Sequence, residues 1–303
     1  MSNILYITIF VVVTAILGYY FKKNDQEFVE NFESFNNTEE RTDTIQIYDK
    51  FYSNVYDTLF ESQLKNEFEL FNIVNYSIKE DKHFKKEDIN FLDLGCGTGY
   101  HLQVIKKHKY PCAGIDNSIT MLKKARKNNP TTNLVNGDFH QRSNFKNRQF
   151  SHITCFFFTI YYSNNPTKLF NNVNYWLKPN GYFCVHLVDK TKFDPVLEKS
   201  SSLIPFYNPQ KHSEKRVTKT KLKFNKFKYV ADWIFNKKKS HFIENFVFDN
   251  KHIQNKHTLY IKNISYYTSL AKKCGFELIK IIDLLPVNHD NNYIYIFKKK
   301  YGR

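Results

Sequence analysis

The sequence has little cysteine and no cysteine pattern. Its five cysteines are odd in number, contain no Cys-x-x-Cys pair and lie mostly in apolar segments. This pattern argues against a disulfide framework and favours reduced core residues in a cytosolic compartment. The eleven histidines form no zinc-binding spacing either, and we interpret His252 and His257 as part of a solvated loop. We therefore predict no metal.

The N-terminal end lacks charge altogether. Residues 1–21 contain no ionisable side chain, and Ile4–Phe21 is almost wholly apolar. As a helix rising 1.5 Å per residue, this stretch would be about 30 Å long, enough to span a bilayer. No basic segment precedes it and no small-residue cleavage site follows it, which favours an uncleaved anchor over a signal peptide. Because Lys22 and Lys23 flank only its C-terminal side, we expect a single-pass membrane protein with the rest of the chain in the cytosol.

Acidic residues are also scarce, 29 against 45 Lys and Arg, but they gather in one segment. Residues 24–45 hold seven acids, one arginine and little apolar periodicity, which predicts a flexible linker. Between residues 47 and 71, aromatic side chains recur at three- and four-residue steps and predict a helix packed against a sheet edge.

The chemistry begins at a cluster of glycines. The apolar run Phe91–Leu94 contains Asp93 and leads into Gly95, Gly97 and Gly99, where the backbone can turn at positive φ and lie against a ligand. A helix starting near Tyr100 would point its free N–H groups into the same space.

A second apolar segment ends in a carboxylate, Asp116, twenty-three residues after Asp93. This spacing suits one βαβ unit whose second acid binds the two hydroxyls of a ribose, and it predicts a nucleoside ligand. Dinucleotide-binding proteins share part of this pattern. Their turn is Gly-x-Gly-x-x-Gly without a preceding acid, whereas this turn is Asp-x-Gly-x-Gly-x-Gly.

With these residues the chain resembles the class I, seven-stranded S-adenosylmethionine-dependent methyltransferases. Val135–Asp138 resembles the end of their third strand, and Leu177–Gly181 resembles the Leu-x-Pro-Gly-Gly turn before their fifth. The resemblance is close over 89–189 and loose over 258–300. The chain departs from the family pattern at Ser151, where an acid is usual, and at Asn180, where glycine is usual, although Asn tolerates the left-handed conformation.

The resemblance implies a doubly wound α/β fold, with a mostly parallel seven-stranded sheet that ends in a C-terminal antiparallel hairpin. Continuous apolar runs at 153–161 and 182–188 agree with strands buried on both faces. We expect helices after Ser118 or Asn117 and from Pro166, and another ending at Gly275.

Residues 190–264 exceed the length of a simple connection. Apolar and aromatic residues alternate with polar ones in three short segments, which predicts a small inserted antiparallel β-sheet. The resemblance to small-molecule methyltransferases implies that this sheet covers the substrate pocket. Residues 190–303 hold 24 Lys and Arg against nine Asp and Glu. Phosphates of a nucleic acid, anionic headgroups or codon bias could each explain this excess, and the alternation favours solvated strand faces. The predicted division is 1–23 anchor, 24–45 linker, 46–189 binding core, 190–264 insertion and 265–303 C-terminal helix and hairpin.

The resemblance also implies site roles. Asp93 and the turn from Gly95 through Cys96 and Gly97 to Gly99 would bind the amino-acid end of S-adenosylmethionine. Asp116 would bind the ribose hydroxyls, and Asp138 with Phe139 would bind adenine. Asn117 and the N-terminal Tyr52 are the other expected contacts to the donor. No general base stands out, and the weak candidates are His186, His140, Tyr161 and Tyr162.

The sequence therefore predicts an S-adenosylmethionine-dependent methyltransferase acting on a small-molecule or lipid-like acceptor at the cytosolic membrane face. An RNA or protein methyltransferase using the basic insertion is the enzymatic alternative. A non-catalytic S-adenosylmethionine-binding membrane scaffold is the other. Methylation of adenine bases or glutamine is disfavoured because no Asn-Pro-Pro-Tyr-type signature follows the fourth strand. The acid-free stretch 151–188 disfavours the paired-glutamate arginine methyltransferases.

Overall fold

The computed structural model describes residues 12, 38–196, 210 and 213–300. The predicted anchor, apart from residue 12, and the linker up to residue 37 lie outside the described residues and stay predictions. Within the part of the chain that the structure describes, no helix has the length and apolar character to cross a membrane.

The larger of two sheets has seven strands, in the order β11-β12-β6-β5-β2-β3-β4. Neighbouring strands pair in parallel except for β12, which is antiparallel to both β6 and β11. This arrangement confirms the predicted α/β fold and the C-terminal antiparallel pair. In chain order the strands are β2 (Phe91–Leu94), β3 (Cys112–Asp116), β4 (Asn133–Asn136), β5 (Phe150–Cys155), β6 (Leu177–Val188), β11 (Phe276–Asp283) and β12 (Asn292–Lys299).

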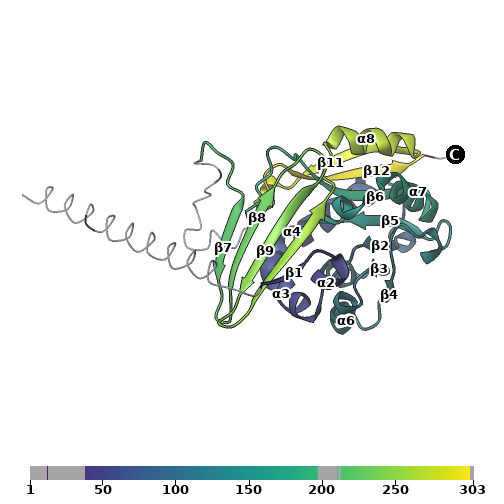
Figure 1. The fold of residues 1–303 in the computed structure, drawn as a ribbon. Helices are drawn as coiled ribbons and strands as arrows, with labels where there is room; N and C mark the ends of the chain where they lie inside the picture. The colour runs from purple at the N-terminus through teal and green to yellow at the C-terminus, as the bar shows by residue number, and fades with distance from the viewer. Residues whose placement is uncertain (1–11, 13–37, 197–209, 211–212, 301–303) are drawn as a thin grey trace, which may run out of the picture.

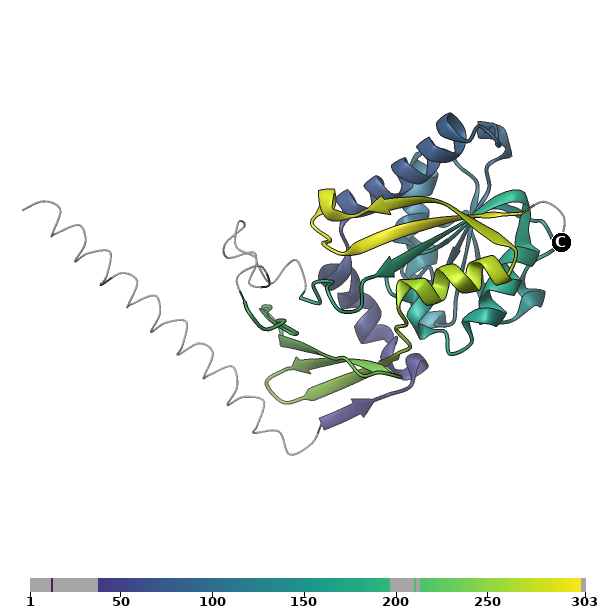
Figure 2. The same ribbon diagram turned by 90° about the horizontal axis from the view of Figure 1, so that it is seen from above.

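Helices cover both faces of this sheet because its strands are apolar on both sides (Figure 2). Phe91 packs with the helices of one face and its neighbour Leu92 with those of the other, as alternation along a strand requires. The first face carries α4 (Gln63–Asn75), α5 (Tyr100–Lys107) and α6 (Ile119–Asn128), and the second carries α7 (Pro166–Trp176) and α8 (Ile264–Lys273).

The predicted helix boundaries are confirmed by their capping contacts. The Ser118 side chain accepts a hydrogen bond from the Met121 N–H and caps α6, and α8 ends before Gly275 at φ +85°. Asn180 has φ +60°, so asparagine takes the left-handed conformation where glycine was expected.

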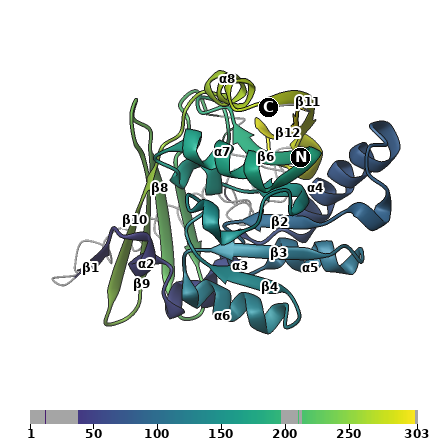
Figure 3. The ribbon, with the colours of Figure 1, turned by 90° about the vertical axis from the view of Figure 1, so that its right-hand side faces the viewer.

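The insertion forms a second sheet, which stands beside the first (Figures 1 and 3). Its antiparallel strands are β7 (Lys219–Lys223), β8 (Lys228–Ile234), β9 (Ser240–Val247) and β10 (His252–Leu259). On β7, Lys219, Lys221 and Lys223 are exposed, whereas Thr220 is buried. The lysines of this strand thus form a solvated face.

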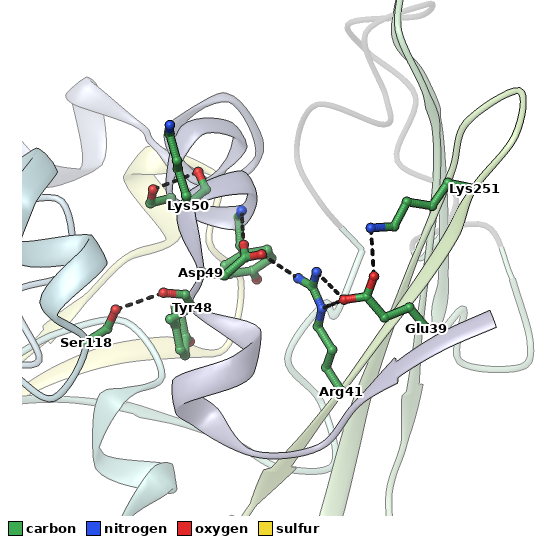
Figure 4. A network of polar contacts seen from close by, with 9 residues as sticks. Glu39, Arg41, Tyr48, Asp49, Lys50, Ser118 and Lys251 are labelled. Atoms are coloured by element: carbon green, nitrogen blue, oxygen red, sulfur yellow. Dashed lines mark hydrogen bonds and ion pairs between the residues drawn. The ribbon is translucent and has the colours of Figure 1, made fainter.

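The linker prediction is wrong from residue 38 onward. Thr38–Arg41 forms β1, which pairs in parallel with β10 at the edge of the second sheet, and α2 (Thr44–Ile47) follows. The acidic composition suggested a solvated tether, but the charges here have partners: Lys251 lies 2.7 Å from Glu39, and Arg41 lies 3.0 Å from Asp49 (Figure 4). Backbone pairing and these contacts hold the segment in place.

The interpretation of His252 and His257 as a solvated loop is also wrong. Both lie in β10 and are buried, with exposed fractions of 6% and 1%. His252 hydrogen-bonds Thr38 of β1, and His257 hydrogen-bonds Glu244 of β9. These hydrogen bonds satisfy buried polar groups in a strand whose sequence is largely hydrophilic.

Candidate active site

The glycine turn follows β2 and has the geometry that its sequence predicts. Gly95, Gly97 and Gly99 have φ values of +64°, +53° and +80°. A Cβ atom on Gly95 would lie 2.5 Å from Cγ2 of Thr159, and one on Gly99 would lie 2.6 Å from the Asn129 amide nitrogen. The turn therefore requires glycine for both its backbone angles and its close packing.

Asp116, at the end of β3, holds the turn in place. Its two carboxylate oxygens accept the N–H groups of Gly97, at 2.9 Å, and Ser118, at 2.8 Å. Burial raises the pKa of this carboxyl, and the backbone N–H groups oppose that rise by favouring the charged form. The arrangement joins the turn to the start of α6, and each oxygen retains a lone pair for a further donor.

Asp93 lies deeper, with 2% of its surface exposed, and accepts a hydrogen bond from the Thr154 hydroxyl at 2.7 Å. Burial raises its pKa to about 6. With Gly95, Cys96 and Gly97 it lines a cavity of about 70 Å³.

A larger cavity, of about 400 Å³, lies between the C-terminal ends of the parallel strands and the second sheet. It brings together most of the predicted site residues: Tyr52, Gly95, Gly97, Asp116, Asn117, Asp138, Phe139, His140 and Tyr162. The insertion contributes Trp233, Phe242, His257 and Leu259 to its wall. Gly99 lines neither cavity, because Ala125 and Asn129 of the α6 region pack against it.

Helix α3 (Lys50–Phe60) supplies Tyr52, Tyr56, Leu59 and Phe60 to the same cavity and lies between the two sheets (Figure 3). Its N-cap, Asp49, accepts the Tyr52 N–H at 2.7 Å and pairs with Arg41 of β1 (Figure 4). The Ser118 hydroxyl donates to the Tyr48 carbonyl at 2.8 Å. These contacts fix Tyr48, Tyr52 and the glycine turn relative to one another.

Two of the four candidate bases are structural. His186 is 1% exposed, and its ring nitrogens contact the Phe157 carbonyl and the Asn292 side chain, so it lies behind the cavity wall. Burial lowers its pKa to about 4. Tyr161 is fully buried, and its hydroxyl accepts the Val188 N–H at 2.8 Å. The assignment of either residue as a base is wrong because neither reaches the cavity.

The other two candidates do line the cavity. His140 is held between the Asp138 carboxylate and the Ser163 hydroxyl, both at 2.8 Å from its ring nitrogens. This arrangement fixes the ring but uses both of its nitrogens. The Tyr162 hydroxyl lies 2.7 Å from Nδ1 of His257, a contact between residues 95 positions apart in the sequence.

Sequence reasoning missed three polar groups at the cavity wall or directly behind it. His257 was placed in a loop, and Glu244, its buried partner, lay in a predicted strand with no sign of a polar role. His289 lines the cavity, and its Nε2 is buried without a hydrogen-bond partner among the described residues. Burial lowers the pKa of His289 to about 4, so its ring is neutral near pH 7. The one sequence signal for any of these groups was the spacing of the two histidines in 252–259, which concerns His257.

No three His, Cys, Asp or Glu side chains of the described ranges are arranged to hold a metal ion.

Comparison with known proteins finds a family match in the centre of the chain. Residues 92–185 match the model of a methyltransferase domain. A dTDP-3-amino-3,6-dideoxy-α-D-glucopyranose N,N-dimethyltransferase of Streptomyces fradiae is 32% identical over 104 residues, which are 30% of this chain and 40% of that protein. The match thus spans about two fifths of that relative.

Solved structures share the fold over most of the chain. An S-adenosylmethionine-dependent methyltransferase of Clostridium acetobutylicum superposes with a TM-score of 0.61 at 17% identity, covering 83% of this chain and 98% of that one. For the S-adenosylmethionine-bound amino pentose methyltransferase CalS10 of Micromonospora echinaspora the TM-score is 0.60 at 15% identity, with 82% and 97% covered. The chain therefore matches a methyltransferase domain over residues 92–185 and shares its fold with solved S-adenosylmethionine-dependent methyltransferases.

Proposed function

We propose that the whole protein is an S-adenosylmethionine-dependent methyltransferase whose acceptor is a small molecule held between the two sheets. One observation carries this proposal. A single cavity of about 400 Å³ is lined on one side by the glycine turn and Asp116 and on the other by aromatic residues of the insertion. Its size lies within the range of small-molecule sites, about 300–1,000 Å³.

The residues of the first wall fit the donor. Gly95 and Gly97 present bare backbone to the cavity, and Asp116 can accept the ribose hydroxyls with its remaining lone pairs. Glu61 borders both cavities, and its buried Oε1 has no partner among the described residues, which suits the ammonium group of the donor. Asp93 and the turn from Gly95 to Gly97 would hold the same amino-acid end. Asp138 and Phe139 would hold adenine.

The bound donor supplies an activated methyl group on a sulfonium, a good leaving group. The protein's own part is then to position the acceptor and exclude water. Phe158, Trp233 and Phe242 form an apolar cover over the cavity, with ring centroids 5.2 Å apart for Phe158 and Trp233 and 4.7 Å apart for Trp233 and Phe242. Such a cover orients a small acceptor and keeps bulk water from the reacting atoms.

The name of the Streptomyces fradiae relative suggests an amino-sugar acceptor. We propose the same chemical class, a small polyhydroxylated molecule that carries an amine. The test is incubation of the purified protein with S-adenosylmethionine and dTDP-3-amino-3,6-dideoxy-α-D-glucopyranose, followed by mass spectrometry of the sugar. A gain of one or two methyl groups, lost in Asp116→Ala, is the expected result. Tight donor binding without a product from any of a panel of sugar and aliphatic amines would contradict it.

The predicted membrane location is part of the proposal and would bring a lipid-like acceptor within reach. It is supported by the uncharged, apolar composition of residues 4–21. Fractionation of cells that produce the full chain or a chain starting at residue 37 tests it. The full chain should sediment with membranes and the shortened chain should not. Equal sedimentation of both chains would contradict the predicted anchor.

A further inference from the structure

Four polar side chains form a continuous chain at the insertion wall of the cavity. The Tyr48 hydroxyl lies 2.9 Å from the Tyr162 hydroxyl, which lies 2.7 Å from Nδ1 of His257. Nε2 of His257 lies 2.7 Å from Oε2 of Glu244. Tyr48, Tyr162 and His257 line the cavity, whereas Glu244 is fully buried behind them. The chain therefore leads from the cavity into the protein.

The hydrogen bonds give this chain a direction. A carboxylate only accepts, so Nε2 of His257 carries the hydrogen that Glu244 receives. In the neutral imidazole Nδ1 is then an acceptor, to which the Tyr162 hydroxyl donates. The Tyr48 hydroxyl can in turn donate to the Tyr162 oxygen, and the lone pairs of the Tyr48 oxygen are left for a proton from the cavity. Every hydrogen in the chain thus points away from the cavity and toward Glu244.

We propose that Tyr48, Tyr162, His257 and Glu244 form a proton relay that removes a proton from an amine acceptor. The inference rests on the proposed function, since it assumes that an acceptor occupies the cavity. The acceptor's ammonium proton passes to the Tyr48 oxygen, the Tyr48 proton passes to Tyr162, and the Tyr162 proton passes to Nδ1 of His257. Both tyrosines end neutral, the amine gains a free electron pair, and the imidazolium lies beside the Glu244 carboxylate.

Atoms and electrons balance in the transfer that follows. The freed electron pair of the amine forms the bond to the methyl carbon as the carbon–sulfur bond breaks, and the electrons of that bond stay on sulfur. The methylated product leaves as an ammonium, and the proton on His257 returns along the chain to the solvent. Amines need such a step because they are protonated at neutral pH and an ammonium has no electron pair to donate.

The groups that face the relay are Tyr52 and Tyr56 from α3, Tyr229 from β8 and Asp116 from β3, which are phenols and a carboxylate. The Tyr229 hydroxyl donates to Oε1 of Glu244 at 2.8 Å and holds this carboxylate in position. Burial raises the pKa of Tyr48 and of Tyr162, so that neither is a phenolate at neutral pH. Each tyrosine can therefore only pass a proton on, and the terminal base is His257.

The test compares wild-type protein with His257→Gln and Tyr162→Phe, using dTDP-3-amino-3,6-dideoxy-α-D-glucopyranose and a panel of aliphatic amines. Both variants should bind S-adenosylmethionine as the wild type does, yet their kcat at pH 7 should fall by about a hundredfold, as for loss of a general base. Raising the pH toward the pKa of the amine should restore much of this loss, because the acceptor then arrives deprotonated. Tyr267→Phe is the matched control: it removes a buried tyrosine hydroxyl that donates to the Tyr260 carbonyl outside the cavity, and it should keep the wild-type kcat and pH profile.

A second readout needs no turnover. With the amine bound and no donor present, the ¹⁵N signals of the His257 imidazole should shift toward imidazolium in wild type and stay neutral in Tyr162→Phe. Variants that are folded and slow at every pH would show a structural role and overturn the relay, as would an imidazole unaffected by the amine. If the wild type binds amines and methylates none, the proposed function fails while the imidazole signal still decides the relay. If no amine binds, both fail.

Discussion

The two walls of the cavity are built in different ways. The donor wall uses a backbone turn and a carboxylate nineteen residues apart, Gly97 and Asp116, which meet because parallel strands end at the same edge. The proposed acceptor wall uses side chains from Tyr48 and α3, the short helix Thr159–Tyr162 and the insertion strands β8, β9 and β10, and its contacts join residues 95 and 114 positions apart. The first wall follows from local geometry. The acceptor wall forms only when the insertion packs beside the larger sheet, so its residues can change without disturbing donor binding.

The largest expected loss of donor affinity is at Gly95, in the glycine turn of the donor wall. In Gly95→Ala a Cβ atom would lie 2.5 Å from Thr159, so the turn must shift, and we expect donor affinity to fall by at least about a hundredfold, ~2.7 kcal/mol. The control is Gly275→Ala. Its φ of +85° imposes similar strain, its nearest neighbour is a side-chain nitrogen at 3.2 Å, and it lines neither cavity. Calorimetric titration should show normal affinity for the control. Equal loss in both variants would mean that general strain, and not the donor turn, is responsible.

Asp116→Ala should have the next largest effect. The substitution removes the acceptor of the Gly97 and Ser118 N–H groups together with the expected ribose contact. A charge-assisted hydrogen bond contributes about 1.5–3 kcal/mol, so donor affinity should fall by about ten- to a hundredfold. Asp116→Asn keeps one acceptor oxygen and should lose less. Titration of S-adenosylmethionine and S-adenosylhomocysteine measures both variants. An affinity equal to that of wild type would sink the ribose assignment.

These two predictions concern residues that the sequence alone identified. The glycine turn, Asp116, Asp138 and the order of buried strands were predictable, because each depends on neighbours within one strand–turn–helix unit. His257 was not, because its polar neighbours in the sequence suggested a loop and its partners Tyr162 and Glu244 come from other segments. The role of residues 38–41 was hidden for the same reason: Glu39 is balanced by Lys251 and by Arg41, which also pairs with Asp49. Local patterns predict a strand and its turn, but docking between segments must be observed.

A third prediction concerns pH. Burial raises the pKa of Asp93 from 3.8 to about 6, so the folded protein holds a proton that the unfolded chain releases. This contribution to stability is fully present below about pH 4 and is lost as the pH rises to about 6. Asp93→Asn should remove that slope and stabilise the free protein above pH 6 by about 2–3 kcal/mol. Denaturant unfolding between pH 4 and pH 8 measures it. The exposed Asp249→Asn should keep the wild-type slope, and a wild-type slope in Asp93→Asn would contradict the prediction.

The smallest expected effect is at His289, which lines the cavity. Its Nε2 is buried without a partner among the described residues, and it lines the large cavity but not the small one beside Asp93. An unpaired buried polar group costs about 1–3 kcal/mol, so His289→Leu should stabilise the free protein by about 1 kcal/mol. The same change should raise the KM for the acceptor several-fold and leave donor affinity unchanged, because a bound acceptor would supply the missing hydrogen bond. His289→Gln, which restores a polar end, should recover part of the KM. If stability and acceptor binding both fall, the ring supports the fold. If stability rises while acceptor binding falls, His289 belongs to the acceptor wall.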